Sequence, residues 1–453
     1  MKTDSPMAAP PQPKDPAALP PKRKWFGYAT VAASLAITFA LWLGAMGAAD
    51  DWYDNAWKYP AKVGSHGTLI LMCWAFFLST RIRMVEWLFG GLDKVYKAHR
   101  HIGEGAFFLI FLHPVFLAVA HADSFSTFFP YLWFSGDWVR NTGLIALAVF
   151  ILLVALSIYS KLSYHRWKRS HHFFGALLIL IVLHAVLANG EIVRYPVLAA
   201  WHGSWVVLAL ASYIYIRVLY RRFGPRHDYA VESVTDVGDG ITDLVLKPNG
   251  PALDAAPGQF VYISFDADAV NKEPHPFSIS NAPEAPHMRL SIKRLGDWTQ
   301  NVANIQPGKT ARVWGPYGHF TNLALAQPLM PLVMIGGGIG ITPFLSLVAS
   351  QGFARRRAKS TLVYAIPDRP SAVYLEELNR RAEALPHFSL KAHYSDDEGY
   401  LNRAYLDGIM DHPFLDCLFM ICGPPPLLAA LRKLLADARV PDRQVIVEDF
   451  EIR

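Results

Sequence analysis

The sequence is poor in cysteine and in charged residues. Its 453 residues include only three cysteines, Cys73, Cys417 and Cys422. They match no metal-ligand spacing and cannot form a disulfide framework, which excludes a compact secreted disulfide domain. Charged residues make up 18% of the chain, below the ~25% of soluble domains, and hydrophobic residues make up 52%. This composition excludes a wholly soluble enzyme and a disordered regulator.

Two further features are weak or missing. No Asp-x-Asp-x-Asp-Gly series occurs, so no calcium-binding loop is predicted. The basic excess is small, with 43 Lys and Arg against 37 Asp and Glu. Such an excess can indicate a nucleic-acid partner, but these cations gather at the ends of apolar segments. We therefore predict membrane orientation and no nucleic-acid binding.

Long apolar runs dominate residues 25–222, which we predict to be a membrane domain. Residues 1–24 hold seven prolines and end in Lys22-Arg23-Lys24, so a disordered Pro-rich tail is expected there. The first run could be a signal peptide, because Gly47-Ala48-Ala49 resembles a cleavage site. However, it is long enough to span, and five more runs follow. Each run is near the ~20 residues that cross a bilayer: about Phe26–Ala49, Val63–Ser79, Ile102–Ala120, Thr142–Tyr159, Phe173–Asn189 and Val197–Leu219.

The positions of Lys and Arg predict the orientation. With the N-terminus inside, the inner connections carry fifteen of these cations. The outer connections carry four, namely Lys58, Lys62, Arg140 and Arg194. Because cytoplasmic loops are enriched in Lys and Arg, both termini and everything after Arg222 are expected in the cytoplasm.

Histidines recur at matched depths in two of the predicted spans. The third span carries His99 at its inner end and His113 deeper in, and the fifth carries His171-His172 at its inner end and His184 deeper in. The separations correspond to roughly 20 Å along a helix. Histidine at membrane depth usually faces inward and serves a function. Two facing pairs at two depths are typical of two haems with paired axial histidines.

Helical arithmetic leaves one choice open. Fourteen residues return a helix to within ~40° of the same face, but thirteen miss by ~140°. His172 misses His184 by a similar angle, so arithmetic does not choose between His171 and His172. One alternative is that these histidines only pack a polar interior. A zinc or copper site is a weaker alternative, because a metal site on one helix needs ligands at i, i+3 or i+4 and these histidines lack such neighbours. Three other histidines lack matched partners and are interpreted as structural: His66, His121 and His202.

After Arg226 the pattern changes to short strands separated by turn residues, which predicts an antiparallel barrel over 227–326. From 327 to 453 strands alternate with helical stretches, which predicts an α/β domain with a parallel sheet. The fold class is thus multidomain: a six-helix bundle, a barrel and an α/β domain. The predicted barrel strands are Tyr229–Val234, Ile241–Lys247, Gln259–Phe265, Phe277–Ser280, Met288–Arg294 and Thr310–Trp314.

A glycine-rich turn follows the first strand of the α/β domain. Residues 336–343 read Gly-Gly-Gly-Ile-Gly-Ile-Thr-Pro, between a strand and a helix. Glycines let the backbone approach a pyrophosphate, and the helix N-terminus supplies N–H donors. The G-x-G-x-x-G form is absent because Ile341 occupies its sixth position, so the turn alone is weak support for a dinucleotide site.

The order of motifs carries a family resemblance. Pro-Gly-Gln-Phe at 257–260, His-Pro-Phe-Ser at 275–278, the glycine-rich turn and Cys-Gly-Pro-Pro at 422–425 resemble the ferredoxin-NADP reductase superfamily. With six spans and two histidine pairs, the chain from about residue 25 resembles the NADPH oxidase and ferric reductase family. Asp93-Lys-Val-Tyr96 and Trp167-Lys-Arg-Ser-His171 are most similar to its bacterial NADPH oxidase members. The resemblance selects His99 and His171 over their neighbours as iron ligands, beside His113 and His184.

The resemblance implies further site residues. Phe277 would lie against the flavin and Ser278 would bind its phosphates, while His275 stands where many relatives carry Arg. Phe450 matches an aromatic that stacks on the flavin, but three residues follow it, so core packing is the alternative. Cys422 would lie near the nicotinamide, and Cys422 and Phe450 are the implied catalytic residues. The implied FAD contacts are His275, Pro276, Phe277, Ser278, Lys293, Gly296, Asp297, Trp298 and Thr299. The implied NAD(P)H contacts are Gly336, Gly337, Gly338, Gly340, Thr342, Arg369, Cys422, Gly423 and Pro424.

The choice between NADPH and NADH depends on a short segment after the second strand of the α/β domain. Arg369 can pair with a 2′-phosphate, whereas Asp368 repels it and favours a ribose diol. The run Arg355 to Arg357 is interpreted as a solvated helix end. We expect NADPH, with NADH as the alternative.

Taken together, the residues and the resemblance predict a transmembrane flavohaem oxidoreductase in the bacterial inner membrane. Electrons from cytoplasmic NADPH would pass through FAD and two b-type haems to oxygen on the outer face and form superoxide. A ferric or cupric chelate reductase, or a subunit that feeds electrons to a membrane or periplasmic partner, is the alternative. A haem-free membrane anchor for a soluble reductase is a further one. The expected partners are membrane lipid, NAD(P)H and the acceptor, with no obligatory protein partner evident.

Overall fold

The structure is a computed structural model that describes residues 24–46, 56, 58–121, 125–158, 164–188 and 190–449. The chain divides into two compact units, Arg23–Arg222 and the part that begins at Phe223. Each unit is described by itself.

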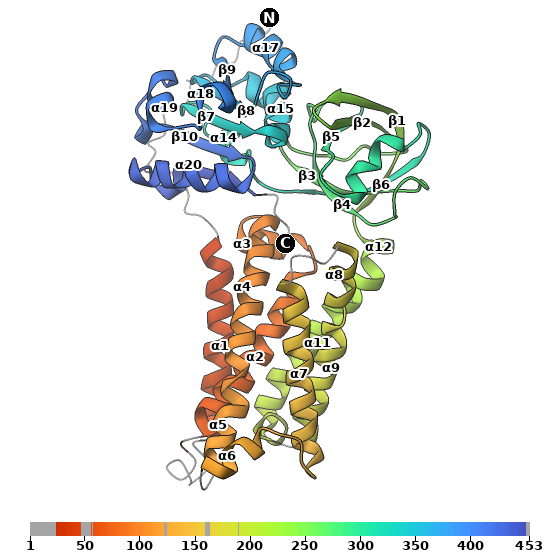
Figure 1. Cartoon of the computed structure of the whole chain (residues 1–453), viewed down its shortest axis with the longest axis vertical. Helices are drawn as coiled ribbons and strands as arrows, with labels where there is room; N and C mark the ends of the chain where they lie inside the picture. Colours follow the sequence, from red (N-terminus) through yellow and green to blue (C-terminus); the bar gives the residue numbers. More distant parts are fainter. Residues whose placement is uncertain are drawn as a thin grey trace, which may run out of the picture. The chain divides into compact units, whose positions relative to one another are not determined.

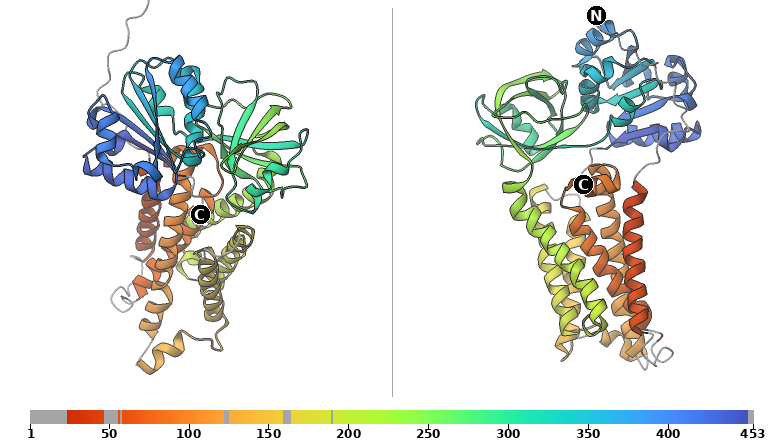
Figure 2. Two further views of the ribbon diagram at one scale, coloured as in Figure 1. Left: turned by 45° about the horizontal axis from the view of Figure 1, so that its top comes forward. Right: turned by 180° about the vertical axis from the view of Figure 1, so that it is seen from behind.

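The first unit is a bundle of helices that run side by side (Figure 1, Figure 2). Within the described residues, six segments are long and apolar enough to cross a membrane, which confirms the predicted number. They are Trp25–Met46, Lys58–Leu78, Leu92–His121, Trp138–Ile158, Arg166–Leu187 and Pro196–Leu219. The helices of this unit are α1 (Lys24–Met46), α2 (Lys58–Leu78), α3 (Arg83–Phe89), α4 (Leu92–Ile110), α5 (Leu112–His121), α6 (Phe125–Tyr131), α7 (Trp138–Ile158), α8 (Tyr164–His171), α9 (Phe174–Leu187), α10 (Glu191–Arg194), α11 (Pro196–Ile214), η2 (Tyr215–Leu219) and α12 (Tyr220–Phe223).

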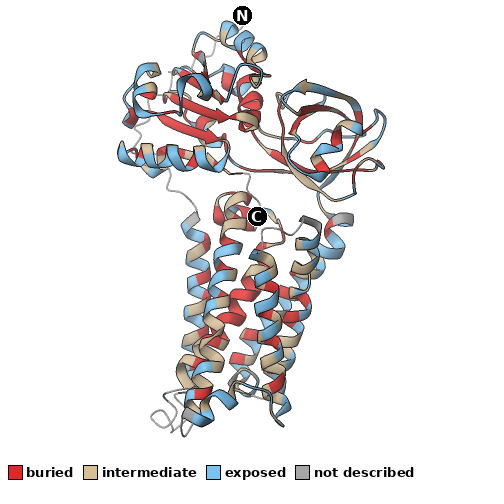
Figure 3. Ribbon diagram, in the orientation of Figure 1, coloured by how far each residue is buried: buried red, intermediate tan, exposed pale blue. Residues whose placement is uncertain are grey.

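Helix α2 is the centre of the bundle. In its most apolar stretch 72% of the residues are buried, against 17–28% in the other five spans. The outward faces of those spans are exposed, as lipid-facing surfaces must be (Figure 3). Glycines allow the close packing: a Cβ on Gly67 would collide with the Leu109 side chain, and one on Gly64 would come within 2.8 Å of the backbone nitrogen of His113.

Two of the six spans are interrupted. The third is broken at Phe111, between α4 and α5, because Pro114 has no N–H to donate to the carbonyl of Ile110. The fifth is broken at His172 and Phe173, between α8 and α9. The first break lies between His99 and His113, and the second lies between His171 and His184. The breaks therefore affect the directions in which these side chains face.

The second unit begins with a six-stranded antiparallel sheet that curls into a barrel (Figure 2). Its order is β4-β3-β6-β1-β2-β5, and an antiparallel bridge between Ile279 and Leu290 joins the two ends. Apolar residues such as Leu244, Val261 and Ile292 fill its interior. The strands are β1 (Arg226–Gly238), β2 (Ile241–Pro248), β3 (Phe260–Phe265), β4 (His275–Ser278), β5 (Met288–Lys293) and β6 (Thr310–Tyr317). Short helices in and after this sheet are α13 (Asp297–Gln300), η3 (Val302–Asn304) and α14 (Asn322–Ala326).

A five-stranded parallel sheet follows, in the order β11-β10-β7-β8-β9. Two apolar clusters cover its faces, one around Met334 and Leu362, the other around Ile335 and Val363. The predicted fold class is therefore confirmed. The strands are β7 (Leu332–Gly337), β8 (Ser360–Ile366), β9 (Phe388–Tyr394), β10 (Leu418–Cys422) and β11 (Val445–Glu448). The helices are η4 (Gly338–Ile341), α15 (Thr342–Ala349), α16 (Gln351–Ala354), α17 (Leu375–Ala384), α18 (Ser395–Glu398), α19 (Arg403–Ile409), η5 (Phe414–Asp416), α20 (Pro425–Asp437) and η6 (Asp442–Gln444).

Candidate functional site

The structure brings the inner histidines together. His99 on α4 and His171 at the end of α8 face each other, with ring centroids 5.9 Å apart. Nδ1 of His99 lies 2.9 Å from the carbonyl oxygen of Ala75 on α2. Nδ1 of His171 lies 3.1 Å from the hydroxyl of Ser157 on α7. Each ring is thus held by a neighbouring helix.

The outer histidines form a second pair of the same kind. His113 on α5 and His184 on α9 have ring centroids 6.4 Å apart. Nδ1 of His113 lies 3.2 Å from the carbonyl oxygen of Ala61, again on α2. Nδ1 of His184 lies 3.1 Å from the carbonyl oxygen of Val139 and 3.0 Å from the hydroxyl of Thr142, both on α7.

These contacts fix the tautomer of all four rings. A carbonyl oxygen only accepts, so Nδ1 of His99, His113 and His184 must carry the proton. The Ser157 hydroxyl donates to the carbonyl of Leu153 at 2.7 Å, so it accepts from Nδ1 of His171 as well. Every ring therefore presents Nε2 as a lone pair, which is the form in which histidine ligates a metal.

The spacing of both pairs fits a metal between them. A metal–nitrogen bond of about 2.0–2.1 Å, with the ring centre about 1.1 Å behind the nitrogen, puts two opposed imidazole centroids about 6.2–6.4 Å apart. The outer pair, at 6.4 Å, lies within this range, and the inner pair, at 5.9 Å, lies slightly below it. Across the described ranges no three His, Cys, Asp or Glu side chains converge on a point. Two ligands per site suit a haem iron, since the porphyrin supplies the remaining four.

The break in the fifth span answers the question that helical arithmetic left open. Thirteen residues misalign two side chains only on a continuous helix. The helix is interrupted directly after His171, and both His171 and His184 contact α7, so the two side chains face the same side of the span. His172 is engaged elsewhere: its Nε2 accepts a hydrogen bond from Arg217 at 3.0 Å.

His66 and His202, for which the sequence shows no partners at matched depth, do lie together, and their interpretation as structural histidines stays a prediction. They lie on α2 and α11 and bond to each other, Nδ1 of His66 to Nε2 of His202 at 3.1 Å. Both are buried. The comparison of histidine depths related only the third span to the fifth. It therefore did not reveal a histidine pair between the second span and the sixth. His121 stacks on Tyr131, with ring centroids 5.1 Å apart.

In the barrel, strand β4 lies beside the segment 296–299. The ring of Trp298 stacks on Phe277, with centroids 5.6 Å apart and planes at 20°, and lies 4.4 Å from His275. The Thr299 hydroxyl accepts from the backbone N–H groups of Leu295 and Gly296 at 2.9 Å each, which closes a tight turn. The segments that the resemblance assigns to the flavin, from His275 to Ser278 and from Gly296 to Thr299, are therefore neighbours. Lys293 instead pairs with Asp239 at 2.8 Å.

In the α/β domain, two glycine-containing loops meet where β7 and β10 end. A Cβ on Gly340 would lie 2.5 Å from the carbonyl oxygen of Cys422, and one on Gly423 would lie 3.1 Å from the Cα of Gly337. Gly338 has φ +52, in the left-handed region that favours glycine. The chain leaves β7 toward β8 on one side and reaches β10 on the other, so these loops lie at the switch point where such sheets bind ligands.

The thiol of Cys422 is fully buried at this point. Burial, assisted by the carboxylates of Glu448 and Asp449, raises its pKa well above the ordinary thiol value. At neutral pH the thiol therefore keeps its proton and is no thiolate nucleophile. Pro424 ends this loop and precedes α20, and the Thr342 hydroxyl donates to the carbonyl of Ile339 at 3.0 Å.

The two side chains that the sequence analysis weighs for the choice between NADPH and NADH follow β8. The Arg369 guanidinium lies 4.9 Å from the ring centroid of Tyr394 and is exposed. Asp368 accepts from the backbone N–H of Ser371 at 3.0 Å, and hydrogen bonds to Ser371 hold the pKa of that carboxyl below its usual value. Phe450 lies outside the described residues.

One residue of the arginine run departs from its interpretation as solvated. Arg355 and Arg357 are exposed, but Arg356 is only 3% exposed. Its guanidinium donates to the carbonyls of Ala324, Gln327 and Met330 and to the hydroxyl of Ser360, and so ties α14 and the loop after it to β8. No pattern of residue types indicates this role, because most of the acceptors are backbone atoms.

Three segments of the chain match known family descriptions. Residues 63–182 match "Ferric reductase like transmembrane component", 229–319 match "FAD-binding domain" and 334–433 match "Oxidoreductase NAD-binding domain". The chain therefore combines a ferric reductase-like transmembrane component with an FAD-binding and an NAD-binding domain, which is the domain architecture of NADPH oxidases and ferric reductases. The ferric reductase-like segment includes His99, His113 and His171. The chain is thus an integral membrane protein with the domains of an oxidoreductase that uses FAD and NAD(P)H.

Individual relatives share only part of this ferric reductase-like chain. It is 28% identical over 234 residues to a flavohemoprotein from Rhodopirellula baltica, covering 46% of this chain and 57% of the relative. It is 28% identical over 230 residues to the ferredoxin reductase component of a 3-ketosteroid-9-alpha-monooxygenase from Mycobacterium tuberculosis, covering 49% and 62%. The chain thus spans less than two thirds of the length of these relatives. A solved FAD/NAD-binding domain of nitric oxide dioxygenase from Vibrio cholerae aligns with a TM-score of 0.44 and 23% identity, over 49% of this chain and 98% of that one.

Proposed function

We propose that the protein moves electrons from NADPH on the cytoplasmic side, by way of FAD and two haems, to oxygen on the opposite side of a bacterial inner membrane, and that superoxide is the product. The observation that carries this proposal is the pair of facing histidine sites in the bundle. Their tautomers and centroid distances match what two axial ligands of a haem iron require. When bound, FAD takes up a hydride and releases its electrons singly, and the haem irons relay single electrons.

The bundle would hold its haems through His99 and His171 at the inner site and through His113 and His184 at the outer site. Neighbouring helices orient these ligands: each Nδ1–H is donated to an acceptor on α2 or α7. Such a bond fixes the ring and raises the basicity of Nε2 toward the metal. If His113 and His184 together hold the outer haem, the acceptor would take its electron without binding iron.

The soluble unit would bind FAD along β4 and the turn from Gly296 to Thr299, and NAD(P)H at the loops where β7 and β10 end. The glycines at 337, 340 and 423 leave no room for side chains between these loops, so the backbone can approach a pyrophosphate closely. The protonated thiol of Cys422 is buried beneath the same loops and brings no charge to them. NADPH is favoured over NADH because Arg369 is the exposed cation after β8.

The test uses the purified full-length protein in lipid nanodiscs with FAD. Added NADPH should reduce two bis-histidine haems, and in air it should give a dye signal that superoxide dismutase abolishes. In His113→Ala the inner haem should still be reduced while the superoxide signal disappears. His121→Ala is the matched control, because His121 lies on the same span and is exposed.

Other outcomes separate the alternatives. A wild-type protein without haem would reject the proposal. Haem reduction that is reoxidised by ferric or cupric chelates but not by air would identify a chelate reductase. Reduction that neither acceptor reverses would indicate a subunit that feeds a protein partner.

A further inference from the structure

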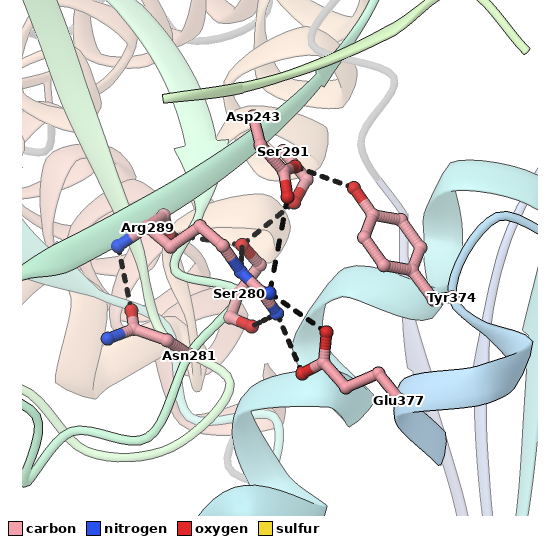
Figure 4. A network of polar contacts seen from close by, with 7 residues as sticks. All are labelled: Asp243, Ser280, Asn281, Arg289, Ser291, Tyr374 and Glu377. Atoms are coloured by element: carbon pink, nitrogen blue, oxygen red, sulfur yellow. Dashed lines mark hydrogen bonds and ion pairs between the residues drawn. The ribbon is translucent and has the colours of Figure 1, made fainter. Parts of the chain in front are cut away.

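A polar network joins the barrel to the α/β domain within the soluble unit (Figure 4). At its centre is Arg289 on β5, whose guanidinium donates two parallel hydrogen bonds to Glu377 on α17. Nη1 lies 2.8 Å from one carboxylate oxygen and Nη2 lies 3.0 Å from the other. This two-point geometry fixes direction as well as distance, which a single contact does not do.

The same guanidinium holds the chain that continues from β4. Its Nη2 donates to the carbonyl of Ser280 at 2.5 Å and its Nε to the Ser280 hydroxyl at 3.2 Å. The backbone N–H of Arg289 donates to the side-chain oxygen of Asn281 at 2.8 Å. Ser280 and Asn281 follow directly on the His-Pro-Phe-Ser strand. One arginine therefore ties the end of the proposed flavin strand to a helix of the nucleotide domain.

Two more bonds connect the domains beside it. The Ser346 hydroxyl on α15 donates to the carbonyl of Asn281 at 2.8 Å. The Tyr374 hydroxyl donates to Asp243 on β2 at 2.7 Å. Helix α15 is the one that the glycine-rich turn opens, so its position sets where that turn lies. The network therefore links β4 to the glycine-rich turn through a few directional hydrogen bonds.

Most of these groups are shielded from water. Ser280 and Ser346 are fully buried, and Tyr374 and Asp243 are 4% and 8% exposed. Hydrogen bonds at such sites resist small displacements more than exposed bonds do. A network that served only to hold the domains together would not need to engage the residues next to the flavin strand.

We propose that Arg289 is a positioning residue for hydride transfer, which sets the register between the flavin strand and the glycine-rich turn. This rests on the proposed NADPH-to-FAD step. Hydride transfer requires reacting atoms about 3–3.5 Å apart, and a 1 Å misplacement can cost ~100-fold in rate. Arg289 touches neither ring in this account and acts through Ser280, Asn281 and Glu377.

The experiment compares Arg289→Lys with the wild type as full-length protein. Lysine keeps the charge but loses the two-point contact. We expect the rate of anaerobic flavin reduction by NADPH to fall about 10–100-fold, with a larger kinetic isotope effect for NADPH deuterated at C4. FAD content and the NADPH concentration for half-maximal rate should stay unchanged. Arg294→Lys is the matched control, since Arg294 pairs with Asp236 nearby at the edge of the barrel.

A second readout needs no cofactor. In protein prepared without FAD, Arg289→Lys should increase hydrogen exchange in the segments 279–290 and 342–349, whereas Arg294→Lys should not. If Arg289→Lys fails to fold, Glu377→Gln takes its place. It removes the charge, keeps one acceptor oxygen and lies at a partly exposed position. Its expected loss of rate is smaller than that of the lysine variant.

The outcomes separate the two levels of the argument. If NADPH does not reduce the flavin of the wild-type protein, the proposed function fails. The hydrogen-exchange comparison then decides by itself whether Arg289 links the flavin strand to the glycine-rich turn. A wild-type rate and isotope effect in Arg289→Lys overturn the positioning role. A slower rate fully explained by lost FAD or a lower melting temperature overturns it as well, because a merely structural role predicts that result.

Discussion

If the bundle holds two haems as proposed, replacing Gly143 by alanine should remove the outer haem and leave the inner one in place. Gly143 lies on α7, and a Cβ built there would be 2.7 Å from Cε1 and 3.0 Å from Nε2 of His184. Ordinary contacts begin at 3.4 Å, so the imidazole must retreat by about 0.7 Å. The ring is held at Nδ1 by Val139 and Thr142, and a shift of that size weakens both bonds.

The size of the displacement decides the outcome. Metal–ligand distances in protein sites are kept to within about 0.2 Å, so about 0.7 Å is more than a bound iron tolerates. The lost hydrogen bonds add about 1–3 kcal/mol. At the inner site His171 touches none of these groups, so its haem should bind as before.

The assay is the haem-to-protein ratio from a pyridine haemochrome spectrum, followed by a potentiometric titration. The ratio should fall from two to one, one midpoint potential should vanish, and the superoxide signal should disappear while NADPH still reduces the inner haem. Gly203→Ala on α11 is the control, because a Cβ there meets nothing within 4 Å at an exposed position. Two haems with unchanged potentials in Gly143→Ala would refute the reasoning.

Three further predictions concern the soluble unit. Asp368→Asn keeps the acceptor for Ser371 but removes a charge beside Arg369, so kcat/KM for NADPH relative to NADH should rise about 10-fold; steady-state kinetics with both nucleotides check this, and an unchanged ratio contradicts it. The pKa of Cys422 is raised in the folded chain, so its contribution to stability is complete below the unfolded thiol value of about 8.5 and falls as the pH rises above it. Urea unfolding from pH 7 to 10 should show this slope in the wild type and a shallower one in Cys422→Ala. Arg356→Met leaves three buried carbonyls without their donor and should lower the free energy of unfolding of the soluble unit by about 3 kcal/mol or more. Hydrogen exchange should report this loss, against under ~0.5 kcal/mol for the exposed Arg355→Met.

Much of the architecture could be predicted from the sequence, because lipid and water each favour a different pattern of apolar and polar residues. Apolar runs of about twenty residues predict spans because no other local structure satisfies the backbone in lipid. The matched depths of His99 with His171 and of His113 with His184 followed from counting along two parallel helices. Short strands separated by turn residues indicated the barrel, and strands alternating with helical stretches indicated the parallel sheet.

The rest depended on features that leave no pattern in the sequence. Counting thirteen residues assumes an unbroken helix, and the break after His171 violates that assumption. Ala61 and Ala75 act through carbonyl oxygens, which every residue has. Arg289 meets Glu377 across 88 positions, a distance at which periodicity carries no information. His66 and His202 are a pair only because the second and sixth spans pack together.

The carbonyls of Ala61 and Ala75 on α2 limit where residues can be inserted into or deleted from the membrane spans. Ala61 and Ala75 are fourteen residues apart, as are His99 and His113, and the deeper acceptor serves the deeper ligand. One residue added or deleted between Ala61 and Ala75, or between His99 and His113, would rotate one carbonyl–histidine contact by about a third of a helical turn. The other carbonyl–histidine contact would stay in place. The connections between helices can lengthen or shorten freely, but these two intervals can only change together.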